Sequence, residues 1–392
     1  MLQGVVLDAF CFTGGKDMKI KPFKVEEWMN EYEASAKYNI AETCVDSVSL
    51  DELFEITGED KEAFLAQLSA RKLTYGDIFG APAFKEGICG LYKTIKPENV
   101  VTTHGAAGAN HHVYYSLVEP GDHVISVIPT YQQLYSIPES MGAEVELLHL
   151  EKENGYLPDL DKLRSMARTN TKIIAINNPN NPTGALMGKD MLMEIVEIAR
   201  SVGAYLFCDE VYRHLTTQEE WCESVADLYE KGISTGSMSK VFSLAGLRQG
   251  WIASRDKEFI DSCLSHRDYN HISCSMFDEA VSAVALRNKD KLIGRNVKIV
   301  SENLAILDEW IKGQPHMTYV KPMAGTTALL HYDFDMDSYE FCRRMYHETG
   351  AFVTPGGCFE EPKCVRIGYA CDKQVLIDGL AAMGEFLKKI EG

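Results

Sequence analysis

Four short segments of this sequence bring together side chains that can do covalent chemistry. They supply amide, carboxylate, phenol, amine and guanidinium groups, and they span residues 177–184, 209–212, 237–240 and 247–251. A lysine amine can attack an aldehyde near neutral pH where burial or nearby cations lower its pKa. Lys240 directly follows Ser237-Met238-Ser239, and this is an unusual setting for a solvated surface lysine. We therefore predict that Lys240 is a nucleophile inside a pocket.

The four segments lie beside predicted β-strands. Several strand-like runs, above all Ile173-Ile174-Ala175-Ile176, are apolar throughout, which is typical of strands buried on both faces of a largely parallel sheet covered by helices. Each segment is expected at or just after the carboxyl end of a strand, where ligands gather in open α/β sheets. The strand-like runs span 123–128, 144–150, 172–177, 204–209, 233–237 and 249–254, and helical patterns such as 158–167 and 189–202 lie between them.

The C-terminal third has a different pattern, which indicates a smaller α+β domain. A helix at 25–38 is expected to pack with it. Because the chain is too long for one ordinary core, we predict two domains. The large α/β domain would take residues 48–280, and the small one 18–47 with 281–392. The C-terminal pattern comprises a helical stretch at 277–312, a strand at 327–334, a helix at 338–349, strands at 351–354 and 365–369, and an amphipathic helix at 373–390.

Composition and charge exclude several classes of function. The chain has 39 Lys and Arg against 57 Asp and Glu, a formal net charge of −18, so nucleic acid and anionic membranes are not expected partners. The eleven cysteines form no CxxC pair, which argues against a disulfide framework or a zinc site, and no metal is predicted. No run reaches transmembrane length and the N-terminus does not read as a signal peptide, so we expect a cytoplasmic protein.

In this order and spacing, the four segments resemble the pyridoxal-phosphate (PLP)-dependent aminotransferases of class I/II, the aspartate aminotransferase type. The resemblance runs from Tyr75 to Arg366, nearly the whole chain. It implies the PLP transferase fold type I, in which a mostly parallel sheet of the seven-stranded type is covered by helices and joined by a smaller α+β domain. It also implies pyridoxal 5'-phosphate as the cofactor.

The resemblance gives the reacting residues their roles. Lys240 would hold PLP as an internal aldimine and then shuttle the substrate proton. Asp209 would keep the ring nitrogen protonated, so that the cofactor can act as an electron sink. An aspartate after a strand can also be a helix N-cap, which is the alternative here. Tyr212 and Asn181 would hydrogen-bond the phenolic oxygen of PLP, although Asn181 also suits a turn.

The phosphate group of PLP needs cations and N–H donors. The resemblance assigns it to side chains and to a turn that precedes a predicted helix: Arg248, Ser237, Ser239 and Gly105-Ala106-Ala107. The family commonly has a hydroxyl residue at the position of Ala107, so this sequence lacks one donor there. Tight packing alone would also explain a glycine–alanine turn.

Three more residues match positions of the family at the site's edges. Tyr131 would stack on the pyridine ring, although an ordinary core tyrosine would look the same. Arg366 would grip the substrate α-carboxylate through two parallel hydrogen bonds, with Asn181 also in contact with substrate. A buried ion pair is the alternative for Arg366. Tyr75 would reach the phosphate in the neighbouring subunit, which implies a homodimer.

These residues serve steps common to many PLP enzymes, so three functions stay open. The favoured one is an aminotransferase that exchanges an amino group between an amino acid and a 2-oxo acid. The second is a β/γ-lyase or cyclase, because residues 38–53, which lack glycine, and Thr102-Thr103-His104-Gly105 are similar to capreomycidine synthase. The third is a non-catalytic regulator, which usually carries a DNA-binding domain that this acidic chain has no room for. The sequence does not identify the amino acid.

Overall fold

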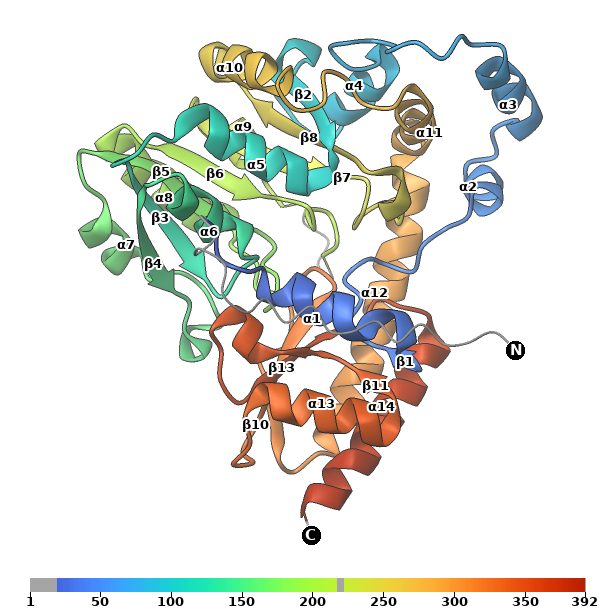
Figure 1. Ribbon diagram of the computed structural model, residues 1–392, viewed down its shortest axis with the longest axis vertical. Coiled ribbons are helices and arrows are strands. Elements are labelled where there is room, and N and C mark those ends of the chain that lie inside the picture. The colour runs from blue at the N-terminus through green and yellow to red at the C-terminus, as the bar shows by residue number, and fades with distance from the viewer. Residues whose placement is uncertain (1–19, 217–221, 392) are drawn as a thin grey trace, which may run out of the picture.

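A sheet of seven strands forms the centre of the larger half of the molecule (Figure 1). The computed structural model describes residues 20–216 and 222–391. The strand order is β2-β8-β7-β6-β5-β3-β4, and only β8 runs antiparallel to its neighbours β2 and β7. This confirms the predicted, mostly parallel sheet. The strands are β2 (Val100–His104), β3 (His123–Ile128), β4 (Glu144–His149), β5 (Thr171–Asn177), β6 (Tyr205–Asp209), β7 (Gly232–Ser237) and β8 (Gln249–Ser254).

Helices cover both faces of this sheet, which explains the uniformly apolar strands. Ile173 and Ala175 of β5 pack into one core cluster, while Ile174 and Ile176 pack into another on the opposite face. Because successive strand residues point to opposite faces, both sets must be apolar. The first face carries α5 (Gly105–Leu117), α6 (Gln133–Ser140) and α10 (Lys257–Arg267), and the second carries α7 (Leu160–Met166), α8 (Lys189–Val202) and α9 (Val225–Leu228).

A second sheet, of order β12-β13-β10-β9, lies in the C-terminal part with helices against it. The N-terminal helix α1 (Lys24–Tyr32) packs on this part, where Trp28 Nε1 donates to the Val353 carbonyl oxygen at 2.9 Å. The elements here are β9 (Met317–Tyr319), β10 (Thr327–Tyr332), α13 (Ser338–Thr349), β12 (Thr354–Pro355), β13 (Cys364–Gly368) and α14 (Lys373–Glu391), with β11 (Ala351–Phe352) pairing with β1 (Tyr38–Asn39).

Two helices replace the single helical stretch predicted at 277–312. The first, α11 (Met276–Arg287), is followed by its C-cap residue Asn288, and α12 (Lys289–Lys312) begins directly after that residue. Asn288 leaves the helical conformation and its Nδ2 donates to Glu59 Oε1 at 2.8 Å and to the Val284 carbonyl oxygen at 3.1 Å. The N-terminal helix is also shorter than predicted, because α1 gives way to a 3₁₀ turn at Glu33–Ser35.

Three shorter helices precede the large sheet: α2 (Leu50–Thr57), α3 (Lys61–Ser69) and α4 (Pro82–Cys89). Of these, α2 packs against α11 and α12, and α4 packs against α11. The division into residues 48–280 and 18–47 with 281–392 stays a prediction. Within residues 20–216 and 222–391, none of the helices combines the length and the apolar character needed to cross a bilayer.

Candidate active site

One edge of the large sheet gathers the predicted site residues. Asn177, Asp209 and Ser237 are the last residues of the parallel strands β5, β6 and β7. Arg248 was expected after a strand's carboxyl end, but it directly precedes β8. It reaches the same edge because β8 is antiparallel, so that Ser237 pairs with Gly250.

A cavity of about 260 Å³ opens at this edge. Its lining includes most of the predicted residues: Ala106, Ala107, Tyr131, Asn181, Asp209, Tyr212, Ser237, Ser239, Lys240, Arg248 and Arg366. Gly105 lies directly beside it as the first residue of α5. Tyr75 is not among the lining residues, and 66% of its surface is exposed. Its predicted contact with a second subunit stays a prediction.

The carboxylate of Asp209 is buried and held from two sides. Its Oδ2 accepts a hydrogen bond from Asn110 Nδ2 at 2.9 Å, and its Oδ1 accepts from the Val211 N–H at 3.2 Å. Thr235 in turn donates to Asn110 Oδ1 at 2.8 Å. Burial raises the pKa of Asp209, and the bonds from Asn110 and Val211 and the charge of Lys240 oppose that shift. Residues 210–215 are turn and coil, so Asp209 caps no helix there.

Lys240 places its amine in the cavity, against the N-terminal segment. Its Nζ donates to Thr43 Oγ1 at 2.6 Å and to Cys44 Sγ at 3.4 Å. Burial by itself lowers the pKa of Lys240, but Cys44, Tyr212 and Glu42 outweigh it and the net shift is upward. This direction is opposite to the lowering expected from nearby cations, because the groups that act most strongly against burial are Cys44, Tyr212 and Glu42.

The start of α5 and the loop before β8 form a close-packed cradle for an anion. Gly105 has φ +68°, and a Cβ there would lie 2.7 Å from Arg248 Nη2. A Cβ on Gly250 would lie 2.4 Å from the carbonyl carbon of Gly105. The first N–H groups of a helix have no acceptor within the helix and carry its positive dipole end. Together with Arg248 and with Ser237 and Ser239, these donors fit a phosphate group.

A substitution tests this cradle. We expect Gly250→Ala to weaken PLP binding about tenfold or more, because overpacking against the Gly105 backbone costs about 1–3 kcal/mol. Titration of the PLP-free protein with PLP, followed by absorbance, measures the affinity. Gly246→Ala, in the turn before β8, is the matched control, since among the described residues no atom beyond its chain neighbours lies within 4 Å of a Cβ at that position. Equal affinity in the two variants would contradict the proposed cradle.

Arg366 lines the same cavity and is buried. It is 2% exposed, and Nη1 donates to Asn181 Oδ1 at 3.3 Å while Nη2 donates to Thr354 Oγ1 at 3.0 Å and to the Ala41 carbonyl oxygen at 3.2 Å. Its Nε is buried without a hydrogen-bond partner. In the part of the chain that the structure describes, no carboxylate lies within 4.0 Å of its guanidinium, so the alternative of a buried ion pair finds no partner there.

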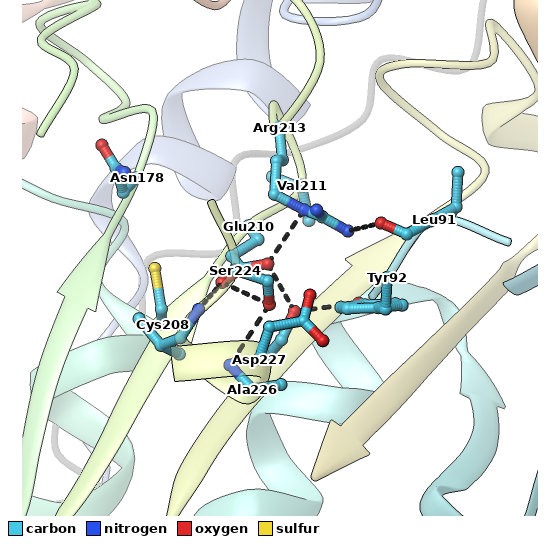
Figure 2. Close-up of polar contacts among 12 residues, drawn as sticks. Leu91, Tyr92, Asn178, Cys208, Glu210, Val211, Arg213, Ser224, Ala226 and Asp227 are labelled. Carbon is cyan, nitrogen blue, oxygen red and sulfur yellow. Dashed lines mark hydrogen bonds and ion pairs between the residues drawn. The ribbon is translucent and has the colours of Figure 1, made fainter. Parts of the chain in front are cut away.

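A buried network fixes the turn that follows Asp209 at the end of β6 and contains Tyr212 (Figure 2). Glu210 Oε2 lies 3.0 Å from Arg213 Nε and accepts from Ser234 Oγ at 2.7 Å. Its Oε1 accepts from Ser224 Oγ at 3.0 Å and from the N–H of Val225, the first residue of α9, at 2.9 Å. Arg213 Nη2 donates to the Leu91 carbonyl oxygen at 2.8 Å. The turn after β6 is thereby tied to β7 and α9.

We expect Glu210→Gln to destabilise the fold by about 3–5 kcal/mol, because it leaves the buried Arg213 charge without a carboxylate. Denaturant unfolding of the variant measures the loss. The double variant Glu210→Gln/Arg213→Met should recover much of it, since it removes the uncompensated charge. A single variant as stable as the parent protein would contradict this role for the ion pair.

The N-terminal segment supplies cavity residues that sequence reasoning missed. They are Val25, Glu26, Met29, Glu33, Glu42 and Thr43. No local pattern links them to the strand edge, because Thr43 lies 197 residues before its partner Lys240. Asn110 was also missed, although helical spacing offered a signal: it follows Ala106 by four residues and shares a face of α5 with it.

Comparisons with known proteins agree with this arrangement. The family model described as aminotransferase class I and II matches residues 54–382. The capreomycidine synthase of Streptomyces vinaceus is 28% identical, covering 93% of each chain. The aspartate aminotransferase of Pyrococcus horikoshii is 28% identical, covering 86% of this chain and 88% of that one. The crystal structure of a PLP-dependent aminotransferase from Streptococcus suis gives a TM-score of 0.92 at 47% identity, covering 95% of this chain and 99% of that one. The predicted fold class is confirmed.

Proposed function

This chain belongs to the class I and II aminotransferases, and we propose that it moves an amino group from an amino acid to a 2-oxo acid with PLP held in the cavity. PLP, when bound, supplies an aldehyde that links to an amine and a ring that accepts the electron pair left at the substrate Cα. One observation carries the proposal: Lys240, Asp209 and Arg366 line a single cavity at the strand edge. Family membership also makes a non-catalytic regulator the weakest of the three alternatives.

Lys240 and Asp209 act on the cofactor, and Lys240 also acts on the substrate. Lys240 holds the cofactor and then carries the proton from the substrate Cα, while Thr43 and Cys44 accept hydrogen bonds from its amine. Asp209 holds a proton on the ring nitrogen, and its contacts with Asn110 and Val211 fix the carboxylate for that task.

The remaining residues bind and orient. Arg248 and the N-terminus of α5 hold the phosphate, and Arg366 binds the substrate α-carboxylate. Asn181, already in contact with Arg366, and Tyr212 would hydrogen-bond the phenolic oxygen of the cofactor. Tyr131 would lie against the ring, and its hydroxyl donates to Glu26 Oε1 at 2.7 Å, which fixes the side chain.

A lyase or cyclase is the second candidate, and the similarity to capreomycidine synthase over 93% of both chains favours it. One assay separates the two. The protein is incubated with single amino acids, with and without 2-oxoglutarate or pyruvate, and keto acid and ammonia are measured. Amino transfer predicts product only when the oxo acid is present. Ammonia released without an oxo acid, or a cyclised product, would contradict it.

We also propose that the protein is a homodimer. Large apolar side chains lie exposed between α3 and α4, and Leu73, Tyr75 and Phe79 are 79%, 66% and 64% exposed. Ser273 Oγ donates to the Tyr75 carbonyl oxygen at 3.0 Å, which places the loop of the 87% exposed Tyr269 beside them. Exposed large apolar side chains gathered in one region are typical of an interface. Sedimentation of the purified protein measures the assembly, and a monomer would contradict it.

A further inference from the structure

Three glutamates line the same cavity as Lys240 and Arg366. Glu26 is on α1, Glu33 is in the following 3₁₀ turn, and Glu42 follows β1. All three are half-buried. Over residues 20–216 and 222–391, none of them has a lysine or arginine nitrogen within 4.0 Å, although the surface of the chain is rich in such pairs.

The hydrogen bonds of these glutamates do not neutralise their charges. Glu26 accepts from a tyrosine hydroxyl, Glu33 Oε1 accepts from Asn39 Nδ2 at 3.3 Å, and Glu42 Oε1 accepts from the Cys44 N–H at 3.4 Å. The pKa of Glu33 is raised, first by burial and then by the negative charge of Glu42. Two neighbouring carboxylates at the edge of a cavity are unfavourable when both are charged, so they either share a proton or bind a cation.

Arg366 independently indicates the charge of a group on the ligand that enters the cavity. Its guanidinium is buried, its Nε lacks a partner, and it faces the cavity without a carboxylate of the described chain beside it. A buried unpaired charge costs several kcal/mol, so the arrangement suits a ligand that brings an anionic group. The cavity therefore offers a site for an anion at Arg366 and is also lined by three carboxylates, Glu26, Glu33 and Glu42.

We propose that this site selects amino acids with a cationic side chain, an ammonium or a guanidinium. Glu33 and Glu42 bind the side-chain cation while Arg366 holds the α-carboxylate. This inference rests on the proposed function, because it assumes that the amino donor occupies this cavity. It also predicts that dicarboxylic amino acids are poor amino donors, since their side chains would face Glu26, Glu33 and Glu42.

Binding of an unreactive ligand tests this inference without turnover. The probe is 5-guanidinopentanoate, which is arginine without its α-amino group, and hexanoate and hexanedioate are the neutral and anionic comparisons. Calorimetry with the PLP-loaded protein is expected to show about tenfold or tighter binding of the guanidino acid than of hexanoate, as for a charge-assisted hydrogen bond. Hexanedioate should bind more weakly than hexanoate. Equal binding of the guanidino acid and hexanoate would overturn the proposal.

Two variants locate the cation site. Glu33→Gln and Glu42→Gln should each lower the preference for the guanidino acid severalfold and leave hexanoate affinity unchanged, which also shows that the Arg366 site is intact. Glu62→Gln, at an exposed position of α3, is the matched control. A preference that survives in the double Glu33→Gln/Glu42→Gln variant would overturn the assignment. Amino transfer without this preference would refute only this inference, whereas selective binding without transfer would refute the proposed function.

Discussion

Lys240→Ala protein is expected to lose the visible absorbance of lysine-bound PLP and to lose amino transfer by roughly 10⁴-fold or more. The variant removes both the nitrogen that holds the cofactor and the group that carries the Cα proton. The other cavity residues keep their positions, because within the described residues Lys240 contributes two hydrogen bonds, to Thr43 and Cys44. Absorbance spectra and single-turnover assays of the purified protein measure the two losses.

Lys298→Ala is the matched control for this experiment. Lys298 lies on α12 with 77% of its side chain exposed, and its ion pair among the described residues is with Glu302 at 3.9 Å. It should keep the spectrum and the activity of the parent protein. If Lys240→Ala retained the visible band, another amine would hold the cofactor and the assignment would be wrong.

Asp209→Asn is expected to lower kcat by about 10²–10⁴-fold and to leave PLP bound. The amide keeps the size of the side chain but only one oxygen, so it can accept from only one of the two donors Asn110 and Val211, and it cannot hold a proton on the ring nitrogen as a carboxylate does. Steady-state kinetics with the preferred amino acid, at saturating PLP, measure the effect.

The control for Asp209 is Asp335→Asn, which changes a fully exposed carboxylate that pairs, among the described residues, with Lys363 Nζ at 3.3 Å. It should leave kcat unchanged. An Asp209→Asn protein with the parent's kcat would show that the ring nitrogen needs no carboxylate in this enzyme. That result would refute the role proposed for Asp209.

The large sheet and several helices were predictable because local signals mark them. The apolar run at 173–176 indicated a strand buried on both faces, and β5 packs into two opposite clusters. The predicted helix at 338–349 has the observed bounds, because Asp337 caps its start and Gly350, at φ +79°, ends it. The break at Asn288 was not predictable, since it depends on a contact with Glu59, 229 residues away.

The site residues, too, were predictable where local signals mark them and not where distant contacts place them. Residues at the strand edge, such as Asn181, Asp209 and Lys240, were predictable because strand ends converge and the segments resemble a known family. The three glutamates that line the cavity were not predictable. Glu26, Glu33 and Glu42 reach the cavity only through packing of the N-terminal segment on the C-terminal part. The upward pKa shift of Lys240 follows from Cys44, Tyr212 and Glu42, and no local pattern around Lys240 reveals them.

The most direct test of the account is to identify the amine that holds the cofactor. Borohydride reduction of the PLP-loaded protein turns the bond between cofactor and amine into a stable one, and peptide mass spectrometry then locates the phosphopyridoxyl group. We predict that it lies on Lys240. A group found on any other lysine, or a protein that takes up PLP without forming a reducible bond, would contradict the account.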